Sequence, residues 1–344
     1  MKSTTIERKR EHLEICLHDK VEMERGAGFE HYRFLHEALP EIAPEDVELR
    51  TSFLGRELAL PFIISSMTGG VERGLAINRH LAGAAKTLGI AMAVGSQRVA
   101  LRHPEAAKSF AVVREVAPDI PVYANLGATQ LNRGYSVLEL GRAIDMIEAD
   151  GLFLHLNPLQ ESIQERGNTD YRNLSERIGE VTGGLDRPVL VKEVGAGISP
   201  RTARLLADQG VAAIDVSGAG GTSWSKIEAL RAEDAERREL GLAFADWGIP
   251  TAQSLVLCRA ELPQLPLIAS GGIRDGITAA KALALGADLV GLALPLLGAA
   301  DQSQAAVEQV LKRFARELRL AMFLVGARDL EELRRGHHLV AELP

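Results

Sequence analysis

The chain has 344 residues, of which 46% are apolar and 25% are charged; this balance is typical of a folded globular protein and excludes general disorder. Its formal net charge of −7 excludes a global basic surface, so the sequence predicts binding of neither nucleic acid nor an anionic membrane. Glycine is unusually frequent, with 33 residues, which is typical of backbone that turns tightly or approaches a ligand closely.

Short apolar runs alternate with amphipathic helical stretches from residue 59 onward. Eight runs are apolar on both alternations, as in strands covered on both faces: 61–65, 90–94, 122–125, 151–155, 189–193, 213–216, 267–270 and 289–292. Helices are predicted at 72–88, 104–116, 136–149, 171–181, 200–209, 251–261 and 275–285. This α/β pattern predicts a (β/α)8 TIM barrel, with an open doubly wound sheet as the alternative.

Two charged segments lie outside this repeat. Residues 1–58 are expected to form an N-terminal extension, and residues 59–344 the barrel. The extension begins with a basic cluster, which is either a solvated arm or an arm that closes over the barrel mouth and supplies cations to an anionic substrate. The insertion at 225–247, after the sixth predicted strand, is either a lid or an assembly surface.

The sequence also predicts where in the cell the protein is located. It shows no recognisable signal peptide and no apolar stretch of spanning length. Two cysteines, Cys16 and Cys258, are too few for a disulfide framework. We therefore expect a cytoplasmic protein.

Polar residues gather directly after the predicted strands. In a barrel these positions meet at one end, where the loops after the strands build the active site. The glycine-rich loops at 218–222 and 271–272 predict a cradle of backbone N–H groups, with Ala293 and Leu294 close by. We therefore expect a phosphorylated cofactor or substrate at this end.

Three ionisable residues at strand ends leave alternatives open. Lys192 is either a Schiff-base lysine, a cation beside the N1/C2 edge of a flavin, or one half of an ion pair with Glu193 or Asp215. Glu161, in a long loop after the fourth strand, is either a solvated carboxylate or a ligand of Mg2+ that a diphosphate shares. His155 is either a base or a hydrogen-bonding barrel residue.

Taken together, the motifs resemble the type 2, FMN-dependent isopentenyl-diphosphate delta-isomerase family. The resemblance runs from Arg8-Lys9 to the segment 326–330, and HLNPLQE at 155–161 and GAGGTSW at 218–224 are its most specific parts. The other matches are SSMTGG at 65–70, AVGSQR at 93–98, ANLG at 124–127, VKEVGAGIS at 191–199, GIPT at 248–251 and ASGGIRDG at 269–276. One departure is Thr278, where the family pattern has an acidic residue; we expect this change to be harmless.

The resemblance implies a function and a site. The implied reaction interconverts isopentenyl and dimethylallyl diphosphate in isoprenoid biosynthesis by a 1,3-proton shift, with FMN reduced by NADPH as acid and base, in a homotetramer or homooctamer. The implied FMN contacts are Ser66, Met67, Thr68, Ser96, Asn125, Lys192, Ser217, Thr222, Gly271, Gly272, Ala293 and Leu294. The implied substrate contacts are Arg8, Lys9, His12, Arg98 and Gln160, the implied Mg2+ ligand is Glu161, and the implied catalytic residues are His155, Gln160, Glu161 and Lys192.

Two other functions compete with this one. An FMN oxidoreductase of the hydroxy-acid oxidase or nucleotide dehydrogenase kind would need a strand-end His/Arg pair or a reactive loop cysteine, and Cys258 lies in a predicted helix. A non-catalytic flavin-binding or prenyl-diphosphate-binding protein is the third hypothesis.

Overall fold

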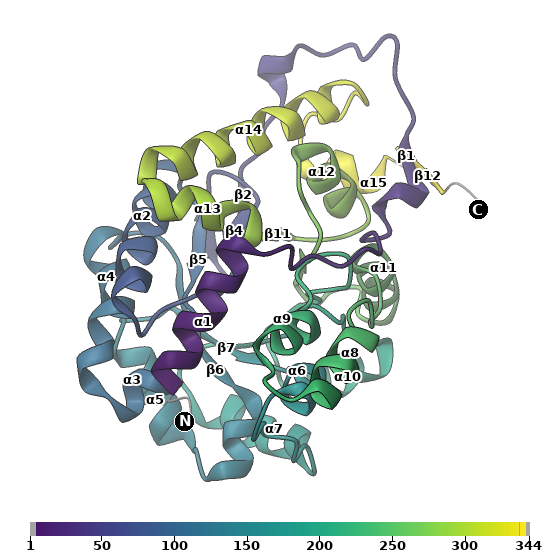
Figure 1. Cartoon of the computed structure of the whole chain (residues 1–344). Helices are drawn as coiled ribbons and strands as arrows, with labels where there is room; N and C mark the ends of the chain where they lie inside the picture. Colours follow the sequence, from purple (N-terminus) through teal and green to yellow (C-terminus); the bar gives the residue numbers. More distant parts are fainter. Residues whose placement is uncertain (1–4, 337, 342–344) are drawn as a thin grey trace.

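Eight parallel strands close into a barrel in chain order (Figure 1). The computed structural model describes residues 5–336 and 338–341, so residues 1–4 of the expected extension and residues 337 and 342–344 of the expected barrel lie outside it. Strand β11 pairs with β4, Val290 opposite Phe62, which closes the ring and rules out the open sheet. The strands are β4 (Phe62–Ile64), β5 (Ala91–Ala93), β6 (Val122–Gly127), β7 (Gly151–His155), β8 (Val189–Lys192), β9 (Ala213–Asp215), β10 (Leu267–Ser270) and β11 (Leu289–Leu292).

The predicted TIM barrel is therefore confirmed, and all eight predicted runs form its strands. Their apolar residues point alternately to the two sides of the sheet. Residues such as Ile63, Tyr123 and Phe153 fill the barrel interior, whereas Phe62 and Ile64 belong to the larger core shared with the surrounding helices. Two buried layers explain why both alternations of each run are apolar.

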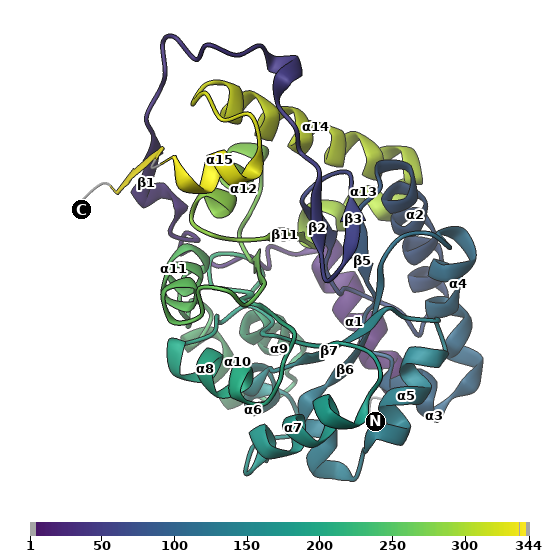
Figure 2. The ribbon, with the colours of Figure 1, turned by 180° about the vertical axis from the view of Figure 1, so that it is seen from behind.

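Helices surround the strands on all sides (Figures 1 and 2). The predicted helix at 171–181 begins later, at Leu174, because Asn173 before it has left-handed backbone (φ 56°). The predicted long loop after the fourth strand is wrong: it contains the short helix α6. The barrel helices are α2 (Glu72–Leu88), α3 (Arg98–Arg102), α4 (Lys108–Val116), α5 (Val137–Asp145), α6 (Pro158–Ile163), α7 (Leu174–Gly184), α8 (Pro200–Asp208), α11 (Thr251–Glu261), α12 (Gly276–Ala284), α13 (Leu294–Gln302), α14 (Gln304–Phe323) and α15 (Leu330–Arg335).

The N-terminal segment runs along the barrel from one end to the other. Helix α1 (Thr5–His18) lies across the barrel, in front of the strands in Figure 1 and behind them in Figure 2. Further on, β1 (Tyr32–Phe34) pairs with β12 (Leu339–Ala341) near the other end of the chain. The hairpin β2 (Thr51–Phe53) and β3 (Arg56–Leu58) packs Phe53 against Tyr123 inside the barrel, with ring centroids 6.4 Å apart. The hairpin thus closes the end of the barrel opposite the polar strand ends.

The insertion at 225–247 is largely helical. Helix α9 (Trp224–Arg231) packs against α1 and α6, and α10 (Ala235–Ala243) packs against α9. In the described ranges, no helix combines the length and the apolar content that a membrane crossing requires.

Candidate functional site

One cavity of about 260 Å³ lies at the carboxyl ends of the strands, with α1 along its side. All the residues that the sequence predicted for catalysis, cofactor, substrate or metal line this cavity: Arg8, Lys9, His12, Ser66, Met67, Thr68, Ser96, Arg98, Asn125, His155, Gln160, Glu161, Lys192, Ser217, Thr222, Gly271, Gly272, Ala293 and Leu294. The structure therefore brings the predicted site together, while the role of each residue stays a prediction.

Lys192 is a buried cation at the end of β8. Its Nζ donates to the backbone carbonyl of Glu193 and to Ser217 Oγ, 3.2 Å away. Burial lowers the pKa of its amine, and the nearby carboxylates of Asp215 and Glu193 oppose that shift. The carboxylate of Glu193 instead accepts from the backbone N–H groups of residues 194–196 at 2.5–2.7 Å. The direct ion pair with Glu193 or Asp215 is therefore not formed in the described part of the chain.

His155 is a neutral imidazole held by Asn125. Its Nδ1 lies 2.8 Å from Asn125 Oδ1, and Asn125 Nδ2 donates to Ser66 Oγ at 2.6 Å. Burial, helped by the positive charges of Lys192, Arg98 and Lys9, lowers the pKa of His155 to about 3. Because the amide oxygen only accepts, Nδ1 carries the hydrogen, and Nε2 is left as an acceptor in the wall of the cavity.

The glycine-rich loops interlock. Gly271 and Gly272 have left-handed backbone (φ 98° and 75°), and a Cβ on Gly271 would lie 2.2 Å from the carbonyl oxygen of Gly218. Only glycine therefore lets the loop after β10 reach the loop after β9. Arg274 follows these glycines, lines the cavity and has a buried Nη2 with no hydrogen-bond partner in the described structure. Arg274 lies within the ASGGIRDG motif at 269–276, but the sequence alone assigned no role to it.

Glu161 is buried in α6 and is the only carboxylate among the described residues that line the cavity. Asn157 Nδ2 donates to Gln160 Oε1 at 2.9 Å and to Glu161 Oε1 at 3.2 Å, and the backbone N–H of Asn168 donates to Glu161 Oε2. These donors fix both side chains, and they exclude the solvated-loop interpretation of Glu161.

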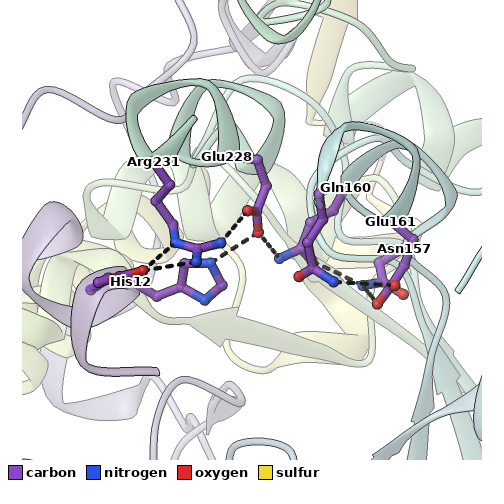
Figure 3. Close-up of polar contacts among 8 residues, drawn as sticks. His12, Asn157, Gln160, Glu161, Glu228 and Arg231 are labelled. Atoms are coloured by element: carbon purple, nitrogen blue, oxygen red, sulfur yellow. Dashed lines mark hydrogen bonds and ion pairs between the residues drawn. The ribbon is translucent and has the colours of Figure 1, made fainter. Parts of the chain in front are cut away.

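Hydrogen bonds and ion pairs join α6 to α9 and α1 (Figure 3). Gln160 Nε2 donates to Glu228 Oε1 at 3.0 Å, and His12 Nε2 lies 2.9 Å from the same oxygen. Arg231 forms ion pairs with Glu228 (2.6 Å) and with Glu11 (2.8 Å). Although burial opposes it, His12 and Arg231 hold the pKa of Glu228 low, at about 2. Glu228 was missed because it lies within the charge-rich insertion, where it resembles a solvated residue.

Two predicted substrate residues are already engaged in the structure. Lys9 Nζ donates to the carbonyl oxygens of Gly69 and Ser96, both at 2.9 Å, and burial lowers its pKa to about 7. His12, bound to Glu228, also packs its ring edge-on against Trp224 at 5.2 Å. Lys9 and His12 therefore dock α1 onto the barrel.

The side chains of Arg8 and Arg98, by contrast, have no hydrogen bond or ion pair with another described residue. Burial lowers the pKa of both guanidinium groups, that of Arg98 to about 10, and Arg8 and Arg98 repel each other, whereas Glu161 attracts both. Two partly buried cations without a hydrogen-bond partner, held near the carboxylates of Glu161 and, for Arg8, Glu228, form a site for an anion.

The polar atoms of the cavity fit bound cofactor and substrate groups. Six buried side-chain atoms of the described residues have no hydrogen-bond partner, and four of them belong to cavity residues: Ser65 Oγ, Gln130 Oε1, Asn157 Oδ1 and Arg274 Nη2. Buried polar groups of folded proteins are normally satisfied, so this concentration indicates ligand atoms at the cavity. No cluster of three or more His, Cys, Asp or Glu side chains suited to a metal occurs in the described ranges, where Glu161 is the single carboxylate of the cavity lining.

Comparisons with known proteins agree with this geometry. The family model of FMN-dependent dehydrogenase matches residues 154–340. The chain is 52% identical over 339 residues to the isopentenyl-diphosphate delta-isomerase of Stutzerimonas stutzeri, covering 98% of each protein. It is 48% identical to that of Pyrococcus furiosus, covering 96% of this chain and 86% of the relative.

Solved structures of other proteins share the fold of this chain. A lactate oxidase of Pediococcus acidilactici matches with a TM-score of 0.68 and 20% identity, over 97% of this chain and 87% of its own. Flavocytochrome b2 matches with a TM-score of 0.71 and 18% identity, over 96% and 82%. The barrel, its cavity and the matching family model define an FMN-dependent barrel enzyme. Within that class, the identity over almost the full length shows that the chain belongs to the type 2, FMN-dependent isopentenyl-diphosphate delta-isomerase family.

Proposed function

We propose that this enzyme interconverts isopentenyl diphosphate and dimethylallyl diphosphate by a 1,3-proton shift with no net redox change. The observation that carries the proposal is the pair of partly buried guanidinium groups without a hydrogen-bond partner, Arg8 and Arg98, near Glu161 in the cavity that Lys192 also lines. An anionic group and a divalent cation fit that corner, and an apolar chain with its double bond would extend toward Lys192.

The diphosphate would be held at the α1 side of the cavity. Arg8 and Arg98 would bind its oxygens as charge-assisted hydrogen-bond donors, and Gln160 would add its amide. Lys9 and His12 would join them only by exchanging their present partners on the barrel and on α9. Binding energy from the diphosphate would then position the remote double bond.

Mg2+ would bind between the diphosphate and Glu161. A single carboxylate, phosphate oxygens and several waters are a common ligand set for this ion. The three donors on Glu161 from Asn157, Asn168 and Gln164 hold its carboxylate in place for such a role.

FMN would lie over the strand ends, with its ring beside Lys192 and His155 and its phosphate near Gly271, Gly272 and Arg274. When bound and reduced by NADPH, FMN supplies the acid and base chemistry that no side chain of the cavity is strong enough to supply at neutral pH. Lys192 would place its positive charge at the N1/C2 edge of the ring.

Helix α1 would exclude water from the reaction. A carbocation formed on the alkene would be trapped by water, so the chemistry requires a dry pocket. In the structure α1 is docked by Lys9 on one side of the cavity and by His12 on the other, with Leu13 buried beneath it.

We also propose a homotetramer or homooctamer as the working assembly.

One anaerobic assay tests the proposal. The protein is incubated with FMN, Mg2+, NADPH and isopentenyl diphosphate, and dimethylallyl diphosphate is measured. Product is expected, and its absence under these conditions overturns the proposed function.

A reactive loop cysteine, one of the two features that an FMN oxidoreductase would need, is not found at Cys258. Cys258 lies on α11 with no exposed surface, its thiol faces the carbonyl oxygen of Ile198 at 3.3 Å, and burial raises its pKa to about 11. Such a thiol is inert rather than reactive.

A further inference from the structure

A buried carboxylate beneath Lys192 has no part in the proposed reaction. Asp215 ends β9, and its backbone lies in register with Lys192 on β8, so the two side chains point to the same side of the sheet. Asp215 is 2% exposed and Lys192 is 6% exposed. Lys192 lines the cavity, and Asp215 therefore lies in the barrel interior just below the cavity floor.

Two serines connect the two charged groups. Lys192 Nζ donates to Ser217 Oγ at 3.2 Å, the hydroxyls of Ser217 and Ser270 lie 2.7 Å apart, and Ser270 Oγ lies 2.7 Å from Asp215 Oδ1. The backbone N–H of Ser217 donates to the same carboxylate oxygen at 3.1 Å. Ser217 itself has left-handed backbone (φ 38°), which is unusual for a residue with a side chain and marks a position fixed by its surroundings.

The end groups fix the direction of every hydrogen bond in this chain. An ammonium group only donates, and a carboxylate only accepts. The hydroxyl of Ser217 must therefore donate to Ser270, and the hydroxyl of Ser270 to Asp215. If Asp215 were neutral, the direction of these hydrogen bonds would no longer be fixed. Lys192 would also lose the one negative charge that hydrogen-bonded side chains connect to it among the described residues.

The other charged groups around Lys192 do not replace Asp215. The carboxylate of Glu193 is directed to the backbone N–H groups of 194–196. His155 on β7, neutral because its pKa is about 3, adds no charge, and Arg98 and Lys9, which also act on His155, are positive themselves. Burial lowers the pKa of Lys192, and the charge of Asp215 is the strongest influence that opposes this shift. Burial in turn raises the pKa of Asp215, and the charge of Lys192 is the first influence that opposes that shift.

We propose that Asp215 is a positioning residue that acts through Ser270 and Ser217 to keep Lys192 a charged ammonium aimed at the cavity. The inference deepens the proposed function and rests on it, because it takes the flavin edge as the partner of Lys192. An ammonium at that edge stabilises the negative charge of the reduced ring, so Asp215 would set the preference of the protein for reduced over oxidised FMN.

The test measures flavin binding rather than turnover. Dissociation constants of oxidised and of dithionite-reduced FMN are measured for the full-length protein between pH 6 and 10, without substrate. The dissociation constant of oxidised FMN divided by that of reduced FMN measures the preference for the reduced ring, and this ratio reports the charge on Lys192. For Asp215→Asn we expect this ratio to fall by about tenfold at pH 8, with the fall beginning roughly one pH unit lower than in the wild type, because one pKa unit is a tenfold change in an equilibrium.

Two serine variants distinguish an effect of the hydrogen bonds between Lys192 and Asp215 from a general effect of removing a buried hydroxyl. Ser270→Ala keeps both charges but removes the hydroxyl that connects Ser217 to Asp215. We therefore expect a smaller change of the ratio in the same direction. Ser254→Ala removes an equally buried serine that bonds to Ile198 on the outer side of the barrel, and the wild-type profile is expected. If Asp215→Asn does not fold, Ser270→Ala decides alone.

The outcomes distinguish this inference from the proposed function. A wild-type ratio profile in Asp215→Asn or, where that variant does not fold, in Ser270→Ala overturns the role of Asp215, even if the enzyme isomerises its substrate. A shifted profile in a protein with no isomerase activity supports the role of Asp215 and overturns the proposed reaction. A wild-type protein that binds no FMN overturns both.

Discussion

At the scale of single residues, Glu161 carries the negative charge that a divalent cation would need in this cavity. We expect Glu161→Gln to raise the Mg2+ concentration for half-maximal isomerase activity by at least about tenfold, because the remaining ligands would be the diphosphate and water. Glu165→Gln is the matched control, since the Glu165 side chain is 76% exposed. The measurement is a Mg2+ titration of initial rates, and an unaltered titration in Glu161→Gln would move the metal elsewhere.

His155 should make the folded protein sensitive to acid. Its pKa is about 3 in the folded state and about 6.5 when unfolded, so below pH 6.5 the unfolded chain binds a proton that the folded chain does not. The resulting loss of stability begins as the pH falls through 6.5 and levels off near 3. Between pH 7 and 5 it should amount to roughly 2 kcal/mol.

Urea unfolding at the two pH values measures this loss. In His155→Gln the decrease in unfolding free energy between pH 7 and 5 should be smaller than in the wild type by that amount. His103→Gln removes a half-exposed histidine for comparison and should leave the decrease unchanged. Equal decreases in wild type and His155→Gln would show that the imidazole protonates in the folded state.

At the scale of elements, the two interlocked loops after β9 and β10 depend on glycine. Gly271→Ala would place a Cβ against the Gly218 carbonyl in backbone that favours glycine, so we expect a loss of about 2–4 kcal/mol in unfolding free energy and weaker FMN binding. Gly183→Ala on α7, where a Cβ meets nothing within 4 Å, should instead stabilise the protein by roughly 0.5–1 kcal/mol. Denaturant unfolding of the apo-protein compares the two, and equal effects would contradict the interlocked-loop explanation.

Helix α1 is the element that couples substrate to the barrel. Deleting residues 1–12 removes Arg8, Lys9 and His12 together, and we expect the KM for isopentenyl diphosphate to rise by at least about tenfold, as for the loss of several charge-assisted hydrogen bonds. FMN affinity should change little, because the predicted FMN contacts lie on the barrel. Arg10→Gln, at an exposed position of the same helix, should leave KM unchanged. Unchanged substrate affinity after the deletion would show that the arm does not close the site.

At the scale of the whole molecule, the barrel could be predicted from the sequence and its closing contacts could not. Eight runs apolar on both alternations predict strands between two cores, and Gly89, with φ 61°, ends α2 where expected. Helix α6 is too short for a periodic pattern. The bond from Gln160 to Glu228 joins residues 68 positions apart, and the pairing of β1 with β12 joins the two ends of the chain. Such contacts depend on packing between elements, which local patterns do not contain.

The insertion has one side that faces the cavity residues and an outer side that carries exposed apolar side chains. Glu228 on α9 faces the cavity residues Gln160 and His12, whereas on α10 and after it Leu240, Leu242 and Trp247 are 47%, 48% and 60% exposed. Exposed apolar side chains at this density are typical of an interface, so the outer side of the insertion is where we expect subunits to meet.

The double change Leu240→Lys and Leu242→Lys tests this expectation. Two charges buried in a subunit interface would have no partners, so the molar mass measured by light scattering should fall toward that of the 37.1 kDa chain. Leu138→Lys, at a 60% exposed leucine of α5, is the matched control and should keep the wild-type mass. If the double variant keeps the wild-type mass, the outer side of α10 is not a subunit interface. If the mass falls and FMN binding persists, the barrel and its cofactor site do not depend on assembly.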